Sequence, residues 1–506
     1  MMEKRSSKFS HSFLKELYEK KYYLIAIWAT LIVTFIYFDG HLEVLPKKTF
    51  LLLGISLSAL LFLKGKVYNK VFSIIMLTGA FFCFYTPVMD SPDENFHYSR
   101  ALYISEGHLY LPSNKQELLV SSDISDVETV FKKPLANTDL GKKEVSSKKV
   151  QYNNLANTNG YSFVSYLPQT LGILVAKVFH LSIFASILLG RFFNLLTFAL
   201  LCRLAIKKSG PREQIFGILA IVPINVYIAA SFNQDAMANG LIFLAIGLFY
   251  SFLDKDKVNY KDLLIYFFLS LLIALSKLPY VLLIGLLLFI PKEKMSQKKY
   301  LTTILLVGIA AFCSLLWLKI TSGFNLNVVN VNPQINPIEK IKYTFENMPD
   351  FFDMMVKEIV NFIPFKLQSL FTFGWLSYDL RSFVWFYLIF ISIVILISPK
   401  APRLKKISKV GVWLVALGII FGILMTSYLL WGEVKDMSIK GIQGRYFSGV
   451  VILLALTASI SARLSIQDSS LVIKECKKEK VEELLFFVAT LFIMVSLLTT
   501  IIQYYL

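Results

Sequence analysis

Cysteine is scarce in this chain of 506 residues, which contains only four. Cys83, Cys202 and Cys313 fall in or at the ends of apolar runs, and Cys476 lies in a lysine-rich stretch. No two of them have the spacing of a metal-binding pair, and no disulfide framework is visible. The sequence therefore argues against a small disulfide-stapled fold and gives no support to a cysteine zinc site.

Charged residues are also few. They make up 17% of the chain, whereas 56% of the residues are hydrophobic, and soluble domains contain about 25% charged residues. Short motifs of nucleotide and zinc enzymes are missing as well: there is no P-loop, no dinucleotide-binding fingerprint and no HExxH sequence. Nucleotide and zinc chemistry have no support, and we expect neither a cofactor nor a metal.

Apolar runs that approach the length needed to cross a bilayer recur along the chain. They predict an all-α polytopic membrane protein with about 13 transmembrane helices and with interfacial helices in a large first outer loop. The expected spans are residues 22–38, 49–64, 70–89, 184–206, 214–230, 235–253, 263–277, 279–291, 301–320, 383–398, 410–430, 446–463 and 484–504. The short pair 263–277 and 279–291 predicts two half-length helices or one broken pair.

Basic residues outnumber acidic ones, 52 to 34, which gives a net charge of +18. They gather in short stretches beside the apolar runs, as in loops that set membrane orientation, and not in a nucleic-acid-binding patch. These stretches share one side of the membrane only if segment 161–180 does not cross it. We therefore expect 161–180, with Pro168 and Gly172, to be an interfacial or re-entrant helix. The N-terminus is then cytoplasmic and the protein a multi-pass plasma-membrane protein that contacts lipid and no nucleic acid.

This topology divides the chain into four parts. Residues 1–65 form a cytoplasmic segment and two extra transmembrane helices, the first uncleaved because no small-residue cleavage site follows its apolar run. Residues 66–320 form a membrane module that carries the outer loop 90–160. Residues 321–382 form a second outer loop, and residues 383–506 form the C-terminal transmembrane helices.

The strongest local signal opens the first outer loop, at residues 91–100. A serine that suits a helix cap and a proline that suits the first turn predict a helix here. On that helix Asp93, His97 and Arg100 share one face, and Glu94 lies beside them. Asp93 or Glu94 can then act as a general base toward a hydroxyl. The alternative is a capped surface helix whose acidic residues favour its positive end.

Two further polar clusters lie at the outer ends of spans. Asn233 and Asp235 follow one span closely, where amide and carboxylate groups serve either as ligand groups or as helix caps. Lys277 and Tyr280 lie in the break between the two short helices. A lysine at this place binds phosphate or extends to the membrane surface.

Arg445 and Tyr446 open a late span from the outside. The planar guanidinium of arginine suits phosphate oxygens, so we expect a phosphate or pyrophosphate contact here. The aromatic stretch 371–381, with Trp375 and Tyr378, lies in the second outer loop. Its rings stack on sugars or anchor the loop at the membrane interface.

Together these pieces resemble the C-type (GT-C) superfamily of membrane glycosyltransferases and, more closely, a bacterial family of multispanning membrane proteins of unknown function placed near it. The matching pieces are Pro92-Asp93-Glu94 with His97, Tyr166-Leu167-Pro168 followed by Arg191, Asn233 with Asp235, and Gly444-Arg445-Tyr446. The resemblance covers most of the chain in layout. This chain departs from it in having two extra spans before the acidic loop.

The resemblance implies transfer of a sugar, with inversion, from a polyprenyl-phosphate donor to a cell-envelope polysaccharide or glycolipid on the outer face. An acidic residue, here Asp93 or Glu94, takes the proton of the acceptor hydroxyl. Lys277 and Arg445 stabilise the polyprenyl phosphate as it leaves. The expected partners are that lipid-linked donor, an envelope glycan acceptor and the bilayer. The substrate-binding residues implied are His97, Arg100, Asn233, Asp235, Lys277, Tyr280, Arg445 and Tyr446.

Two other functions stay open from the sequence. A flippase or other transporter of lipid-linked oligosaccharides would place polar residues near mid-membrane and often shows repeated halves. A polysaccharide polymerase or ligase would carry its large outer loop late in the chain. Here the polar clusters lie at the outer ends of spans, and long loops lie both early and late.

Overall fold

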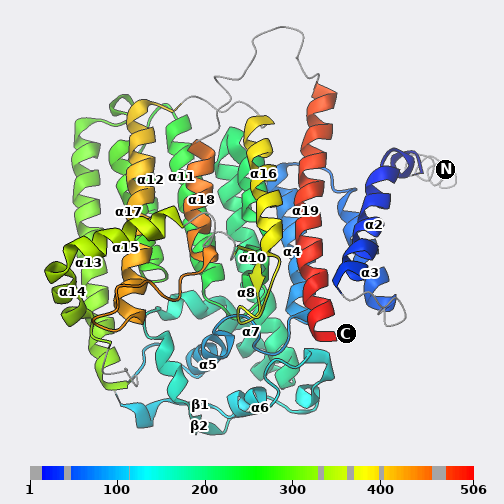
Figure 1. The fold of residues 1–506 in the computed structure, drawn as a ribbon, viewed down its shortest axis with the longest axis horizontal. Helices are drawn as coiled ribbons and strands as arrows, with labels where there is room; N and C mark the ends of the chain where they lie inside the picture. The colour runs from blue at the N-terminus through cyan, green and yellow to red at the C-terminus, as the bar shows by residue number, and fades with distance from the viewer. Residues whose placement is uncertain are drawn as a thin grey trace.

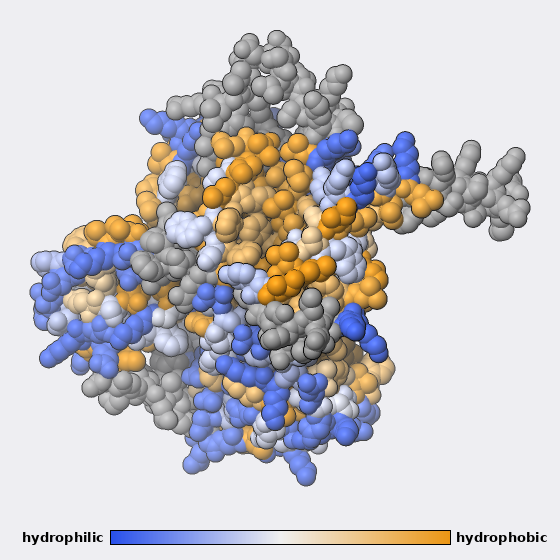
Figure 2. All heavy atoms as spheres, turned by 45° about the vertical axis from the view of Figure 1, so that its right-hand side comes forward, coloured by the Kyte–Doolittle hydropathy of each residue, from blue (hydrophilic) through white to orange (hydrophobic). Residues whose placement is uncertain are grey.

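The computed structural model describes residues 14–38, 47–112, 114–328, 335–361, 370–397, 404–457 and 475–505. Long helices lie side by side in a bundle, and short helices and a small sheet gather at one end of it (Figure 1). We call this end, which holds residues 90–160, the loop end, and the other the opposite end. Figure 2 shows an apolar belt over the helices and hydrophilic residues concentrated below it, around the loop end.

Six helices in the described part of the chain are long and apolar enough to cross a membrane. They are α4 (Val67–Tyr85), α8 (Ile183–Lys208), α11 (Asp235–Asp254), α13 (Gln297–Val328), α17 (Lys406–Trp431) and α19 (Glu475–Tyr505). Shorter helices accompany them: α2 (Lys21–Phe38), α3 (Lys47–Leu60), α12 (Tyr260–Ala274), the 3-10 helix η8 (Leu278–Phe289), α16 (Arg381–Ile397) and α18 (Ser448–Thr457). The all-α membrane architecture is thus confirmed.

The expected number of spans, about 13, is not confirmed by helix length. The described parts of the expected apolar segments fall mostly on helix, but only six helices in the described ranges meet the length and composition of a span, or seven if one bent pair is counted. Segments 49–64 and 263–277 give helices of only 14 and 15 residues. A helix needs about 20 residues to cross the apolar core unaided.

The expected straight span 214–230 is broken. It forms α9 (Glu213–Ala220), which follows the short turn η7 (Gly210–Arg212), and α10 (Pro223–Ala229), with a bend of 74° between them. Pro223 has no N–H to continue the helix, and the residue before a proline is driven out of the helical region. Val222 accordingly has a ψ of 135°.

The loop end has a hydrophobic core of its own, to which Tyr98, Ile124, Leu155 and Phe232 contribute buried side chains. Strands β1 (Leu119–Ser121) and β2 (Lys149–Gln151) pair antiparallel across it. Its helices are α5 (Glu94–Ser105) and α6 (Asp123–Thr129), and its 3-10 turns are η2 (Lys115–Glu117), η3 (Leu135–Asn137), η4 (Asp139–Lys142), η5 (Asn153–Thr158) and η6 (Phe163–Tyr166). This core fixes α5 against the bundle.

Segment 161–180 contains η6 and the twelve-residue helix α7 (Leu167–Val178). α7 packs closely on α8, because a Cβ on Gly172 would lie 2.5 Å from the backbone nitrogen of Gly190. Small residues allow this approach between helix backbones. The helix therefore lies against the bundle beside α5, where it supports the loop end.

The stretch expected to form the second outer loop contains two amphipathic helices and a hairpin. The helix α14 (Pro337–Glu346) meets Tyr428 of α17 through a hydrogen bond of Thr344, and α15 (Met348–Val360) packs on Tyr428 through Phe351. The hairpin consists of β3 (Thr372–Phe373) and β4 (Tyr378–Asp379). Two further 3-10 turns complete the described elements, η9 (Lys292–Lys294) and η12 (Gly444–Phe447).

Candidate functional site

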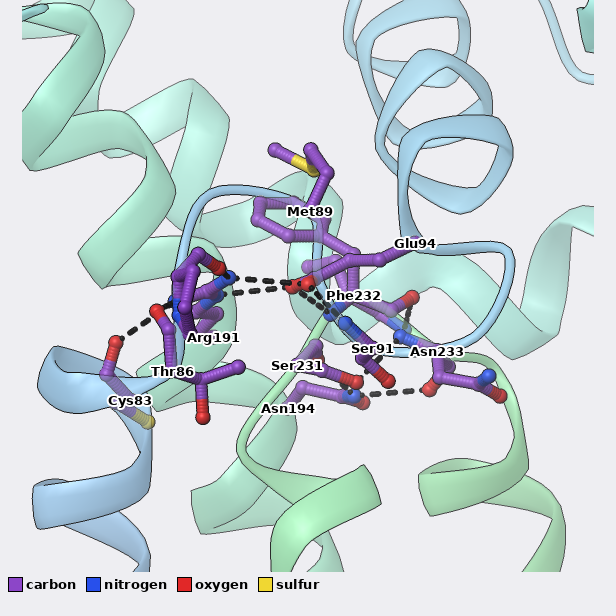
Figure 3. A network of polar contacts seen from close by, with 12 residues as sticks. Cys83, Thr86, Met89, Ser91, Glu94, Arg191, Asn194, Ser231, Phe232 and Asn233 are labelled. Atoms are coloured by element: carbon purple, nitrogen blue, oxygen red, sulfur yellow. Dashed lines mark hydrogen bonds and ion pairs between the residues drawn. The ribbon is translucent and has the colours of Figure 1, made fainter. Parts of the chain in front are cut away.

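The turn that leads from α4 into α5 is held by Arg191, in α8 (Figure 3). Its guanidinium donates to the carbonyl oxygens of Cys83, Thr86 and Pro87 over 3.0, 2.8 and 2.8 Å. Nε and Nη2 donate to the carboxylate of Glu94 over 2.8 and 3.0 Å. All five N–H donors of the side chain are therefore used.

The acceptor positions of the Glu94 carboxylate are also filled. Besides the two bonds from Arg191, its carboxylate accepts the backbone N–H of Phe232 at 3.1 Å and that of Ser91 at 3.3 Å. Four bonds fill the acceptor positions of a carboxylate, and both Glu94 and Arg191 are fully buried. Glu94 thus ties two turns and α8 together and has no acceptor position left for a substrate proton.

A second turn, residues 231–235, lies against the first (Figure 3). The side-chain amide of Asn194 donates to the carbonyl oxygens of Ser231 and Asn233 over 2.7 and 3.0 Å. The side-chain amide of Asn233 donates to the carbonyl oxygen of Pro92 over 3.0 Å. Asn233, expected to bind substrate, therefore uses this amide to join the two turns.

The first turn differs in detail from the helix expected at its sequence. α5 begins only at Glu94, so Pro92 lies before the first helical turn and Ser91 does not cap it. Met89 and Asp93 have φ angles of 54° and 59°, in the left-handed region. That region is costly for residues other than glycine, and such strain concentrates at functional sites. Asp93 precedes the helix and was wrongly placed on its face.

Segment 161–166 brings a third piece of chain to the site. The backbone N–H of Ser162 donates to the carbonyl oxygen of Leu275 over 3.0 Å, and the hydroxyl of Ser165 donates to that of Ser276 over 2.8 Å. The segment is thereby fixed to the break between α12 and η8. The break is the place where Lys277 was expected to meet a ligand.

Asp235, Lys277 and Arg445, which we call the Asp235 cluster, lie together although they come from three distant parts of the sequence. The ammonium of Lys277 donates to Oδ1 of Asp235 over 3.0 Å, and Nε of Arg445 lies 3.4 Å from Oδ2. Their side chains are only 11%, 4% and 5% exposed for Lys277, Asp235 and Arg445. One buried carboxylate thus faces two buried cations.

Tyr446 lies between the two cations of this cluster. Nζ of Lys277 is 5.0 Å from the centre of its ring, and the guanidinium carbon of Arg445 is 5.4 Å from it. Both distances are within the range of a cation–π interaction. The hydroxyl of buried Tyr280 donates to the carbonyl oxygen of Tyr446 over 2.7 Å and so fixes the η12 turn.

Arg445 has two donor atoms without a hydrogen-bond partner among the described residues. Its Nε and Nη1 atoms are buried, yet neither donates a hydrogen bond to any of the residues that the structure describes. Unused buried donors cost free energy unless a ligand or water occupies them. The guanidinium is the type of group that binds the oxygens of phosphate.

Asp93 lies close enough to the Asp235 cluster to feel its charges. Its carboxylate is partly exposed and makes no hydrogen bond within the described ranges. Burial raises the pKa of this carboxyl above its usual range, Arg445 opposes the rise and Asp235 adds to it. The side chain is thus a carboxylate with free acceptor positions and increased basicity, close to the guanidinium of Arg445.

His97 lies next to this group and is uncharged at neutral pH. Its Nδ1 is 2.9 Å from the hydroxyl of Tyr166, and its ring lies 6.0 Å from that of Tyr161. Burial lowers the pKa of His97 to about 3, although Asp235 acts in the opposite direction. The structure therefore brings His97, Asp93 and the Asp235 cluster to one place, as the sequence predicted.

Residues 76–454 match the family model described as "Predicted membrane protein (DUF2142)". The chain belongs to this family. The matched region covers about three quarters of the chain and contains Asp93, Glu94 and the Asp235 cluster. No curated protein and no solved structure matches the chain.

One contact at the site crosses the boundary of the DUF2142 match. Tyr504 of α19, outside it, donates its hydroxyl to Oδ1 of Asp90 over 2.8 Å. Burial raises the pKa of the Asp90 carboxyl to about 7, although this hydrogen bond lowers it. Trp375 covers the same turn, because its indole nitrogen donates to the carbonyl oxygen of Met89 over 3.0 Å.

Arg100, an expected site residue, is buried, and its Nε and Nη1 atoms have no hydrogen-bond partner among the described residues. Its Nη2 donates to the carbonyl oxygen of Leu109 over 2.9 Å, so it holds the segment that follows α5. The sequence singled out neither Asp90 nor Tyr161 as a site residue. The position of Asp90, directly before the acidic motif, was an available signal, whereas Tyr504 had none.

Metal ligands do not converge at this site. Among the described residues there is no group of three or more histidine, cysteine, aspartate or glutamate side chains placed to hold a metal ion. The polar groups that do converge are one free carboxylate and two cations. That combination suits a hydroxyl and an anion as substrates.

Proposed function

We propose that this DUF2142 protein is a membrane glycosyltransferase. It transfers a sugar, with inversion, from a polyprenyl-phosphate donor to a hydroxyl of a cell-envelope polysaccharide or glycolipid, on the outer face of the plasma membrane. The observation that carries the proposal is the partly exposed, unbonded carboxylate of Asp93 beside buried Arg445, which with Lys277 faces the carboxylate of Asp235 at the end of a membrane helix bundle.

Asp93 is the proposed general base. It takes the proton of the acceptor hydroxyl as the acceptor oxygen attacks the anomeric carbon. The raised pKa of this carboxyl favours proton uptake, because a base works best when its pKa approaches the working pH. His97 is neutral and hydrogen-bonded to Tyr166, so it lines the site without adding charge.

Lys277 and Arg445 bind the departing phosphate. As the bond between sugar and phosphate breaks, negative charge grows on the phosphate oxygens, and preorganised donors stabilise it most in a buried site. Nη1 of Arg445, which has no hydrogen-bond partner among the described residues, supplies that stabilisation. Asp235 holds both cations in position before the donor arrives.

Glu94, the other candidate base, is assigned a structural role. Its four hydrogen bonds and its full burial leave it no access to a substrate hydroxyl. The base proposed is therefore Asp93, and the acidic pair of the motif divides into one catalytic and one structural carboxylate.

The test is sugar transfer by the purified full-length protein in nanodiscs, with a panel of polyprenyl-phosphate sugars and a crude envelope polysaccharide as acceptor. We expect wild type to consume one donor and Asp93→Asn to lose about 10²–10⁴-fold in rate while its unfolding midpoint stays unchanged. Asp126→Asn, at a partly exposed position in the same loop, is the matched control. Consumption of no donor, or an Asp93→Asn variant as active as wild type, would refute the proposal.

A lipid-linked oligosaccharide flippase is the second candidate, and the broken pair α9–α10 favours it. Discontinuous helices with a bend such as the 74° found here line the substrate paths of many transporters. A polysaccharide polymerase or ligase would use the same base and phosphate-binding residues. Reconstituted vesicles that expose a labelled lipid-linked glycan without consuming it would favour the flippase over the transferase.

A further inference from the structure

A cavity of about 890 Å³ lies at the opposite end of the bundle. It borders the first half of α4, whereas Asp93 follows the other end of that helix. Its walls are the hairpin of α2 and α3 on one side and helices α4 and α19 on the other. Figure 1 shows α2 and α3 standing beside α19, outside the main bundle. The volume lies in the range of sites that hold small molecules, about 300–1,000 Å³.

The lining of the cavity has two zones. Its interior is apolar, with Ile27, Leu57, Ile74, Phe487 and Met494 among the side chains. Its rim is charged and contains six lysines and five glutamates, from the segment before α2, the segment between α3 and α4, and the first turns of α19. A cavity with a charged mouth and an apolar interior fits an amphiphile.

The depth of the cavity matches one leaflet of a bilayer. Lining residues extend along α19 from Glu479 to Met494, which at the α-helical rise corresponds to about 22 Å. One leaflet of a bilayer, head groups included, is about 20–22 Å thick. A head group at the rim would therefore place an acyl chain against the apolar interior.

Several charges of the rim are already paired. Lys20 with Glu483 and Lys70 with Glu482 form ion pairs of 2.8 and 3.0 Å. A further pair of 2.8 Å joins Lys64 to Glu16. These pairs tie the N-terminal hairpin and α4 to α19, and they leave the remaining charges of the rim available.

The rim charges without an ion pair in the described part of the chain include three lysines and two glutamates. The lysines are Lys15, Lys66 and Lys480, and they give the open rim an excess of positive charge. Lysine clusters at a membrane surface attract lipid phosphates. The charge of the rim thus favours an amphiphile whose head group contains a phosphodiester.

We propose that this cavity binds one glycerophospholipid, with its phosphodiester on Lys15, Lys66 and Lys480 and an acyl chain between the α2–α3 hairpin and α19. The lipid completes the packing of the hairpin against the bundle. The site is separate from the Asp235 cluster and does not depend on the glycosyltransferase proposal.

Native mass spectrometry of the full-length protein tests the site. Lipid-stripped protein is titrated with phosphatidylglycerol or phosphatidylethanolamine in mixed micelles. We expect one tightly bound lipid in wild type. In Lys66→Gln/Lys480→Gln we expect the affinity for this lipid to fall by at least about tenfold. The matched control is Lys257→Gln/Lys298→Gln, which removes two exposed lysines at the same end but outside the cavity. Equal binding in both double variants overturns the proposal.

Two further arms separate the head group from the chain. Leu491→Trp fills the apolar zone and leaves the rim unchanged, so we expect it to displace the lipid. Glycerol phosphate, which has no chain, is expected not to compete. Two results would contradict an acyl chain in the apolar interior. One is a lipid that still binds to Leu491→Trp, and the other is glycerol phosphate that competes at the same concentrations as the lipid. Stronger binding of phosphatidylglycerol than of phosphatidylethanolamine supports the role of the lysine excess.

Discussion

Two buried arginines at the loop end, Arg191 and Arg445, differ in how completely their donors are used. Arg191 spends all five N–H groups on Glu94 and on three backbone carbonyls. Arg445 lies 3.4 Å from Asp235 and keeps Nε and Nη1 unbonded within the described chain. The saturated pair holds the fold together, whereas the unsaturated one leaves donors that a ligand or water can occupy.

The two carboxylates of the acidic motif show the same contrast. Glu94 accepts four hydrogen bonds and is fully buried, whereas its neighbour Asp93 accepts none from the described residues and is partly exposed. Of these two adjacent carboxylates, one is therefore structural and the other is free for the proposed chemistry. Their environments, and not their sequence, separate them.

The largest expected effect comes from breaking the saturated pair. Glu94→Gln leaves Arg191 as a buried charge without a carboxylate, and such losses cost about 3–5 kcal/mol. We expect a large fall in the unfolding midpoint in detergent, with loss of activity as a consequence. Asp126→Asn, which breaks an exposed pair with Lys143, is expected to leave the midpoint unchanged. Similar midpoints for the two variants would contradict the structural role of Glu94.

Breaking the unsaturated pair should affect activity more than stability. Arg445→Gln removes the proposed phosphate donors, and we expect a decrease of about 10²–10³-fold in sugar transfer. The unfolding midpoint should change little, because Lys277 still neutralises Asp235. Arg445→Lys should recover only part of the activity, since an ammonium lacks the planar fork of donors. Arg203→Gln, on an exposed arginine at the opposite end, is the control.

A smaller effect is expected in how the stability of the protein depends on pH, through Asp90 in the first turn. The pKa of Asp90 is raised to about 7 in the fold, so protonated Asp90 favours folding. Its contribution is complete below the unfolded pKa of about 4 and is lost as the pH rises through about 7. We expect wild type to lose stability across this window and Asp90→Asn to lose less. Parallel curves of midpoint against pH would show that Asp90 is not responsible.

The smallest expected effect concerns the pH dependence of transfer itself. Because the pKa of Asp93 is raised, activity should increase with pH as this carboxyl ionises and then level off. The acidic limb should remain in His97→Gln, because the neutral ring of His97 does not titrate in that range. Disappearance of the limb in His97→Gln would assign it to His97 and not to Asp93. Initial rates from acidic to neutral pH measure both.

The sequence predicted the all-α membrane architecture because apolar runs leave a strong signal in composition and periodicity. It also predicted the elements of the site, since Asp93, His97, Lys277 and Arg445 come together as expected. Ionisable residues are rare in membrane-spanning helices, so those that occur tend to mark functional sites.

The sequence could not separate Asp93 from Glu94, because the difference depends on Arg191, about 100 residues away in the chain. Nor could it predict the start of α5 at Glu94, since the left-handed φ of Asp93 is imposed by tertiary contacts. Arg100 had the spacing of a site residue, yet its donor goes to Leu109. Long-range hydrogen bonds decided each of these cases.

The hydrogen bond between Tyr504 and Asp90 joins residues 414 positions apart. During synthesis, at about 5–20 residues per second, a ribosome needs about 20–80 s to make the intervening chain. For that time the carboxyl of Asp90 lacks the hydroxyl that holds it in the finished protein. The turn that carries Asp93 is therefore completed late in biogenesis, when α19 docks and Tyr504 reaches Asp90.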